Sequence, residues 1–207
     1  MPDPSPLIRL KRAGETAPGR PIFERVAVVG VDGAGAALAL ATRRAWPSSL
    51  VIGIDRTDLV GRAIRRHMVD VGSADMMLVS EADLVVLAST PDANAVTLCR
   101  LAETINGEAA VTDLGDRPRT TLDAARVLPP RLRFVAGQLV ADVAPGTIET
   151  ADPDWLSRCS WFFVIEAVGA PPILERLLQF ASGVGARPIP VSESEFARRI
   201  ATGREAP

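Results

Sequence analysis

Lysine, histidine and cysteine are scarce in this chain of 207 residues. Lys11 is the only lysine, which excludes Schiff-base chemistry, because that chemistry needs an amine inside the fold. His67 is the only histidine, and we expect it at the surface near a helix end rather than in a Ser-His-Asp hydrolase site. The two cysteines, Cys99 and Cys159, lie far apart and indicate neither a disulfide framework nor a zinc site. This cysteine usage fits a reducing, cytoplasmic location.

The chain also lacks an excess of charge and any long apolar run. Lysine and arginine together number 23 against 25 acidic residues, so no global field favours nucleic acid or an acidic membrane. The longest apolar runs have the length of strands, well below the roughly 18 residues of a membrane span. We therefore expect no nucleic acid and no membrane as partners. Residues 1–20 are rich in proline and charge and are predicted to be a disordered lead-in without the apolar stretch of a secretory signal.

Apolar runs alternate with helical stretches from residue 26 onward. Residues 26–30 (VAVVG) are a β-branched run, followed by a glycine-rich turn and the alanine-rich stretch 34–45. Residues 50–55 (LVIGID) repeat the strand pattern, and Thr57 stands where an N-cap would open the next helix, to about residue 67. Strands this continuously apolar are typical of a parallel sheet that is covered on both faces.

The same alternation continues along the rest of the chain. Further strands are predicted at residues 84–88, 109–113, 133–136, 161–166 and 187–191, and further helices after Pro91 and at residues 118–127, 171–182 and 193–200, with a turn-rich stretch at 142–153. We therefore predict an α/β fold, a Rossmann-like, doubly wound and mostly parallel sheet. The dinucleotide-binding domain is expected over residues 21–192, followed by a short C-terminal helix and tail over 193–207.

A glycine-rich turn follows the first predicted strand. Dinucleotide-binding folds place G-x-G-x-x-G there, which gives a tight turn, close approach to the pyrophosphate and close packing of the helix. This chain has Gly30, Asp32 and Gly35 at the three positions. A carboxylate at the middle position would repel a phosphate at the helix N-terminus, unless Asp32 turns away, caps the helix itself, or Gly33 gives the loop another path. The sequence leaves open whether a cofactor binds at this turn.

Polar residues follow two further strands at the same predicted edge. Asp55 ends the second strand near the spacing of an acid that binds ribose hydroxyls, although an acid there can also be a turn residue or a cap. Arg56 could hold a 2′-phosphate or be a solvated surface charge, so NAD and NADP both stay open. Ser89 and Thr90 follow the strand at 84–88, where ligands lie in open α/β folds, but Ser-Thr-Pro also opens helices. The predicted cofactor-binding residues are Gly30, Asp32, Gly33, Gly35, Asp55, Arg56, Ser89, Thr90 and Gly115.

Six blocks in order resemble the prephenate dehydrogenases. They read PIFERVAVVGVDGAGAALALATRRA, LVIGIDR, ADLVVLAST, AAVTDLGD, LRFVAGQLVAD and GARPIPVSESE, and the match extends over residues 21–199. The resemblance implies a Rossmann domain that binds NAD or NADP and a small-molecule substrate, prephenate or arogenate, in tyrosine biosynthesis. It also implies a helical C-terminal domain that completes the substrate site and forms the dimer.

The chain departs from this family's pattern in its catalytic blocks. The block that usually reads GGHPMAG, whose histidine takes the substrate's hydroxyl proton, reads AGQLVAD here, with Gln138 in place of the histidine. Glutamine cannot accept that proton near neutral pH, so general-base catalysis, worth roughly 10²–10⁴-fold, would be lost. The usual TDVGSVK block reads TDLGDRP at residues 112–118, without its serine and lysine. No catalytic residue is therefore assigned.

Two hypotheses of different class follow from the resemblance and its departures. The first is an NAD(P)-dependent oxidoreductase of the prephenate dehydrogenase type that relies on a partner subunit or an unusual base. The second is a pseudoenzyme that serves as a nucleotide-binding or protein-interaction module, and the missing histidine, the end of the chain at Pro207 and Asp32 favour it. A homo-oligomer paired through sheet edges or helices and a complex with a partner subunit both stay open.

The remaining acids and aromatic residues predict no further site. The acids in the second half are too spread out or too loop-bound to hold a metal and are interpreted as surface residues: Asp113, Asp116, Asp123, Asp142 and Asp152. Four aromatic residues in and beside a predicted strand are interpreted as core: Trp155, Trp161, Phe162 and Phe163. No metal site is predicted.

Overall fold

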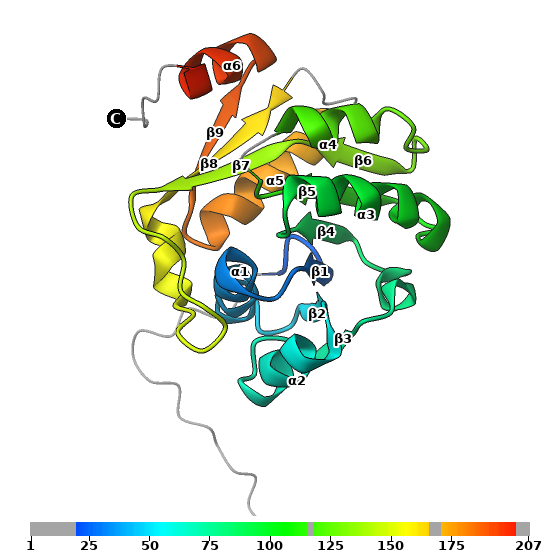
Figure 1. The fold of residues 1–207 in the computed structure, drawn as a ribbon, viewed down its shortest axis with the longest axis vertical. Coiled ribbons are helices and arrows are strands. Elements are labelled where there is room, and N and C mark those ends of the chain that lie inside the picture. Colours follow the sequence, from blue (N-terminus) through cyan, green and yellow to red (C-terminus); the bar gives the residue numbers. More distant parts are fainter. Residues whose placement is uncertain (1–19, 116–117, 166–170, 202–207) are drawn as a thin grey trace, which may run out of the picture.

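Six parallel strands form the central sheet of the computed structural model, which describes residues 20–115, 118–165 and 171–201 (Figure 1). The strands are β1 (Arg25–Val29), β2 (Leu50–Ile54), β3 (Val71–Ser73), β4 (Leu84–Leu87), β5 (Ala109–Asp113) and β6 (Leu132–Val135), in the order β3-β2-β1-β4-β5-β6. This order confirms the predicted doubly wound fold. Apart from Arg20, the predicted N-terminal lead-in lies outside the described residues, as do Asp116 and Arg117.

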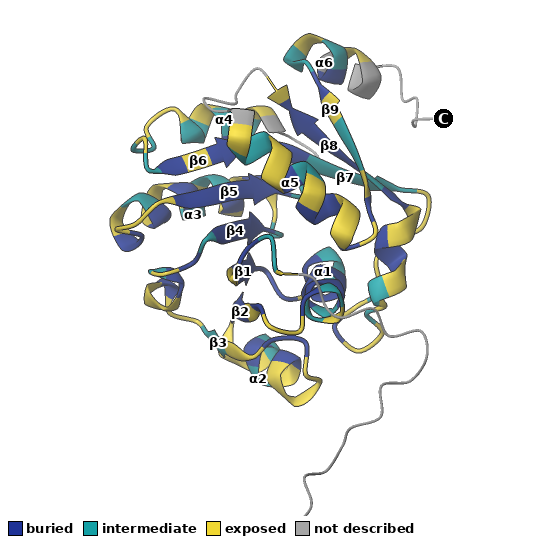
Figure 2. Ribbon diagram, turned by 180° about the vertical axis from the view of Figure 1, so that it is seen from behind, coloured by how far each residue is buried: buried dark blue, intermediate teal, exposed yellow. Residues whose placement is uncertain are grey.

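Helices cover both faces of this sheet. They are α1 (Gly33–Ala45), α2 (Thr57–Arg65), the 3-10 helix η1 (Met76–Val79), α3 (Pro91–Thr104) and α4 (Pro118–Ala125). One apolar cluster joins α1 and α2 to one face, and a second joins η1, α3 and α4 to the other. Figure 2 shows the buried strands between these layers. Because the chain passes from β1 outward to β3 and then returns to β4 on the other side of β1, a crevice is expected at the carboxyl ends of β1 and β4.

A second, three-stranded sheet is built from the C-terminal part of the chain. Its strands are β7 (Gly137–Ala141), β8 (Cys159–Val164) and β9 (Arg187–Val191), with β7 antiparallel and β9 parallel to β8. The 3-10 helix η2 (Pro153–Arg158), α5 (Pro171–Gly183) and α6 (Glu193–Ala201) complete this part. The sequence analysis did not foresee β3, β7 or the separation into two sheets.

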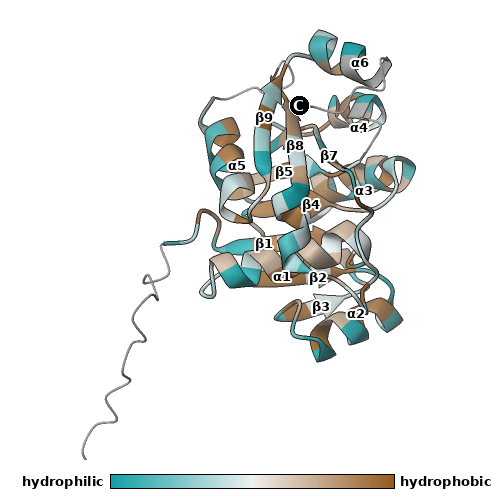
Figure 3. Ribbon diagram, turned by 90° about the vertical axis from the view of Figure 1, so that its left-hand side faces the viewer, coloured by the Kyte–Doolittle hydropathy of each residue, from teal (hydrophilic) through white to brown (hydrophobic). Residues whose placement is uncertain are grey.

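Aromatic side chains hold the second sheet and α5 against α1. Phe180 on α5 stacks on Trp46 at 5.3 Å between ring centroids and meets Phe23 and Trp161 edge to face. The prediction that the aromatic residues at 155 and 161–163 belong to the core is confirmed, since all four are buried. Figure 3 shows both hydrophilic and hydrophobic residues on the outer helix α2, as in an amphipathic surface helix.

The start of α2 differs from the prediction. Arg56 is the N-cap residue and Thr57 is already the first residue of the helix, so Thr57 does not cap it. His67 follows the helix in a left-handed conformation with φ of 55° and is exposed, as predicted. No helix in the described ranges is long and apolar enough to cross a membrane.

Candidate functional site

The glycine-rich turn between β1 and α1 is held by close contacts that only glycine permits. Gly30 has φ of +100°, and its amide donates to the carbonyl of Ile54 at 2.8 Å, which ties the turn to the end of β2. A Cβ atom on Gly35 would lie 1.8 Å from the carbonyl oxygen of Gly30. The first turn of α1 can therefore approach the strand only because residue 35 has no side chain.

Asp55 joins the end of β2 to this turn. Its Oδ2 accepts the amide of Val31 at 2.9 Å and its Oδ1 accepts the amide of Arg56 at 2.7 Å. The carboxylate is only partly buried, and its two oxygens have further lone pairs that can accept hydrogen bonds from hydroxyl donors. Arg56 pairs with Asp58 at 3.3 Å, and its hydrogen bonds hold the pKa of the Asp58 carboxyl below its usual value.

Asp32 caps α1, one of the alternatives that the sequence left open. Its Oδ1 accepts the amide of Gly33 at 2.9 Å, and Gly33 adopts a left-handed conformation with φ of +51°. The same oxygen accepts the amide of Ile148 at 2.6 Å, from the segment that follows β7. The carboxylate thus occupies one hydrogen-bond donor at the N-terminus of the helix, where an anion would otherwise bind.

The turn between β4 and α3 is fixed by a buried asparagine that the sequence analysis missed. Thr90 caps α3 by accepting the amide of Ala93 at 3.4 Å. Asn94 is fully buried, accepts the amide of Ser89 at 3.2 Å and donates to the carbonyl of Ser89 at 3.2 Å. The sequence signal that could have identified Asn94 is an amide side chain among the apolar positions of α3. Asn94 holds the carboxyl end of β4 in place.

Asp113, predicted at the surface, is in fact fully buried at the carboxyl end of β5. The prediction was wrong because residue spacing does not show that β7 covers this strand end. The carboxylate of Asp113 accepts hydrogen bonds from the amide of Gly137 at 2.7 Å and from the hydroxyl of Thr121 at 2.9 Å. Burial raises the pKa of Asp113 to about 7, against the lowering effect of these two bonds. Gly115 lies next to it, since a Cβ there would be 3.5 Å from Asp113 Oδ2.

The fold gathers most of the predicted positions at one edge of the sheet. Gly30 to Gly35, Asp55, Ser89, Thr90 and Gly115 all follow the carboxyl ends of β1, β2, β4 and β5. The carbonyl of Leu114 accepts the amide of Leu139 at 3.4 Å, which places Gln138 on β7 beside the end of β5. Because neighbouring carboxyl ends of parallel strands meet at one edge, these residues form one candidate ligand site.

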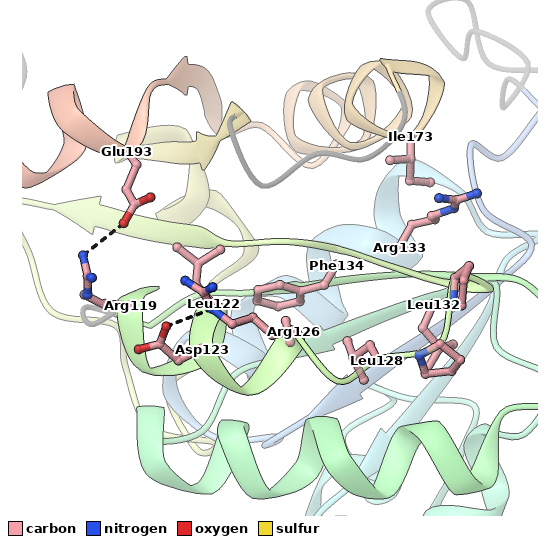
Figure 4. A pocket seen from close by; sticks show the side chains of 13 residues that line it. Arg119, Leu122, Asp123, Arg126, Leu128, Leu132, Arg133, Phe134, Ile173 and Glu193 are labelled. Carbon is pink, nitrogen blue, oxygen red and sulfur yellow. Dashed lines mark hydrogen bonds and ion pairs between the residues drawn. The ribbon is translucent and has the colours of Figure 1, made fainter.

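A separate groove of about 360 Å³ runs along β6, the edge strand of the central sheet (Figure 4). Phe134 lies in it, and the ion pairs Arg119–Glu193 at 3.2 Å and Arg126–Asp123 at 3.3 Å cross its rim. None of the predicted cofactor residues lines it. Most of its charged side chains are paired with one another, and the candidate ligand site therefore lies at the strand ends and not in this groove.

Comparison with known proteins gives a consistent family assignment. The family model described as prephenate dehydrogenase, nucleotide-binding domain, matches residues 38–188. The prephenate dehydrogenase of Bacillus subtilis is 32% identical over 122 residues, which is 57% of this chain and 33% of that protein. The chain therefore spans about a third of the length of this curated relative.

Solved structures share the fold. Prephenate dehydrogenase from Aquifex aeolicus, solved with hydroxyphenyl propionate and NAD⁺, superposes with a TM-score of 0.73 at 19% identity over 84% of this chain and 61% of the other. Arogenate dehydrogenase from Synechocystis superposes with a TM-score of 0.77 at 22% identity over 86% of this chain and 63% of the other. The match of the family model over residues 38–188, well over half of the chain, shows that this chain belongs to the family of prephenate dehydrogenase nucleotide-binding domains.

Proposed function

We propose that this chain binds NAD or NADP at the carboxyl ends of β1, β2 and β4, as the nucleotide-binding part of a dehydrogenase of the prephenate type. The observation that carries this proposal is the contact of Asp55 with the glycine-rich turn. Its carboxylate fixes the turn through Val31 and keeps acceptor capacity for the ribose hydroxyls. The tight approach of Gly35 to Gly30 supplies the backbone geometry that this ligand class uses.

The residues fit the adenosine half of the cofactor better than its diphosphate. Asp55 suits a ribose, and Arg56 next to it is exposed and could pair with the 2′-phosphate of NADP instead of with Asp58. The diphosphate position at the N-terminus of α1 is the place where Asp32 lies. When bound, the nicotinamide would accept or deliver a hydride, and the residues that follow β4 and β5, namely Ser89, Thr90 and Gly115, would hold this half of the cofactor.

The proton-transfer step has less support from this chain. A dehydrogenase acting on a hydroxy acid such as prephenate needs a group that takes the hydroxyl proton, and Gln138 on β7 cannot do so near neutral pH. This observation favours a second candidate function, a nucleotide-binding module without hydride transfer of its own. The first proposal also includes a homo-oligomer or a partner subunit that completes the substrate site. It further includes a role in tyrosine biosynthesis and a cytoplasmic location.

Calorimetric titration of the full chain with NAD⁺, NADP⁺ and ADP-ribose tests the binding proposal. We expect binding in the wild-type protein and a loss of about tenfold in affinity for all three ligands in Asp55→Asn, because one charge-assisted acceptor for a hydroxyl is removed. Glu103→Gln, an exposed change on α3, is the matched control and should bind like the wild type. Failure of all three ligands to bind would refute the proposal.

A second assay separates the two candidate functions. If the chain is a dehydrogenase domain with a missing base, Gln138→His should increase the reduction of NAD(P)⁺ in the presence of prephenate or arogenate, measured at 340 nm. If it is a binding module, both proteins bind the cofactor in the titration and neither forms NAD(P)H.

A further inference from the structure

The segment that follows β7 lies on the glycine-rich turn. We call residues 145–150 the covering loop. A Cβ atom on Gly33 would be 3.6 Å from Pro145 Cγ and 3.7 Å from the carbonyl oxygen of Gly146, so the loop is in contact with the start of α1. Ile148 at its centre is buried, with 1% of its surface exposed, in the same apolar cluster as α1. The loop is therefore packed on the helix rather than extended into solvent.

Asp32 fastens the covering loop to the turn. Its Oδ1 accepts the amide of Gly33 at 2.9 Å and the amide of Ile148 at 2.6 Å, although Asp32 and Ile148 are 116 positions apart in the sequence. One carboxylate oxygen thus receives one donor from the helix and one from the loop. Hydrogen bonds to an ionised acceptor are about twice as strong as neutral ones.

The other side of the covering loop is fastened to α2. Arg62 forms an ion pair with Glu149 at 2.8 Å, and Arg66 donates to the carbonyl of Glu149 at 2.7 Å. Within the loop, the amide of Thr147 donates to the hydroxyl of Thr150 at 3.0 Å. The loop therefore bridges the N-terminus of α1 and the C-terminal end of α2.

This arrangement places a negative charge and a chain segment at the diphosphate position. In a dinucleotide site the amides at the N-terminus of α1 bind the diphosphate, which carries two negative charges. Here one of them, Gly33 N–H, already donates to Asp32, and the carboxylate would repel the incoming phosphates. A dinucleotide can reach these donors only after Asp32 turns away, and its turning removes the acceptor of Ile148.

We propose that Asp32 is a specificity-determining residue that holds the covering loop as an internal substitute for the diphosphate. This inference rests on the proposed function and deepens it. Ligands with a diphosphate must displace the carboxylate and release the loop, whereas adenosine, which has no phosphate, binds at Asp55 without doing so. The chain therefore discriminates against dinucleotides relative to nucleosides, and the discrimination resides in one side chain.

Two substitutions separate the charge of Asp32 from its role as acceptor. Asp32→Asn keeps an oxygen for the amides of Gly33 and Ile148 and removes the charge, whereas Asp32→Gly removes both. We expect the affinity for NAD⁺ to rise by roughly tenfold or more in Asp32→Gly and by less in Asp32→Asn. The affinity for adenosine should stay within about twofold of the wild-type value in both variants. Arg44→Gln, which alters an exposed ion pair with Asp154, is the matched control.

Hydrogen exchange of the full chain reports the covering loop directly. Without ligand, the amide of Ile148 should be protected in the wild type and in Asp32→Asn and should exchange faster in Asp32→Gly. Addition of NAD⁺ to the wild type should accelerate this exchange, and adenosine should leave it unchanged.

Three results would overturn the inference, and they are distinguishable from failure of the proposed function. The first is an Ile148 amide that stays equally protected when NAD⁺ binds. The second is an unchanged ratio of NAD⁺ to adenosine affinity in Asp32→Gly, and the third is rapid exchange of Ile148 in the ligand-free wild type. In these cases nucleotide binding itself still stands. If no variant binds NAD⁺ or adenosine, both the proposed function and the discrimination are refuted.

Discussion

The burial of Asp113 predicts that stability falls as the pH rises. Its pKa is raised from 3.8 to about 7 in the folded protein, chiefly by burial. A carboxyl group with a raised folded-state pKa binds its proton more tightly in the folded than in the unfolded chain. Its contribution is therefore complete below pH 3.8 and is lost as the pH rises through about 7.

The size of this effect follows from the separation of the two pKa values. At 1.36 kcal/mol for each pH unit, the complete loss is about 4 kcal/mol, and somewhat more than half of it falls between pH 5 and pH 8. The perturbation that isolates it is Asp113→Asn. The amide oxygen can still accept from Gly137 at the 2.7 Å position, and the amide nitrogen can donate to Thr121.

Urea denaturation of both proteins between pH 5 and pH 8 measures the difference. We expect the free energy of unfolding of the wild type to fall by about 2 to 3 kcal/mol relative to Asp113→Asn over this range. In Thr121→Val the carboxylate loses a donor, so the folded-state pKa of Asp113 should rise further and the loss of stability should extend to a higher pH. A difference between wild type and Asp113→Asn that does not change with pH, or that grows in favour of the wild type, would refute the reasoning.

Two further predictions concern backbone contact and thiol exposure. Gly35→Ala should lower the free energy of unfolding by about 3 kcal/mol in urea denaturation, because its Cβ would lie 1.8 Å from a backbone oxygen. The control Gly107→Ala, whose Cβ would have nothing within 4 Å, should have a free energy of unfolding close to that of the wild type. In a thiol titration of the native protein only Cys99 should react, because Cys159 is buried and desolvation raises the pKa of its thiol to about 12. In urea, both cysteines should react. Equal native reactivity of the two thiols, or equal stability of the two glycine variants, would contradict these expectations.

Much of the central sheet could be predicted from local pattern. The runs at residues 26–30, 50–55, 84–88 and 109–113 are apolar because both faces of those strands are covered, and each contains an observed strand to within one residue. Strand β3 has only three residues, of which none is fully buried, so it has no comparable signal. Strand β7 was missed because its residues alternate little and its pairing partner, β8, is reached only after a long connection.

The candidate site was predictable in its position and not in its contacts. The glycine pattern and Asp55 are short-range features, so the sequence by itself determined the turn, the first helix and the edge of the sheet where a ligand would bind. Asp113 looked like a surface acid because nothing near it in the sequence shows that Gly137 and Thr121 enclose it.

Only the tertiary structure decided what Asp32 does. A carboxylate at that position can cap the helix, turn to solvent or repel a phosphate, and residue types alone do not choose among these. The amide that fixes it belongs to Ile148, 116 positions away, which reaches Asp32 because its own side chain is buried on α1. Local chemistry therefore determined where the site lies, and long-range packing decided which groups occupy it, because burial and hydrogen-bond partners depend on segments that meet only in the folded chain.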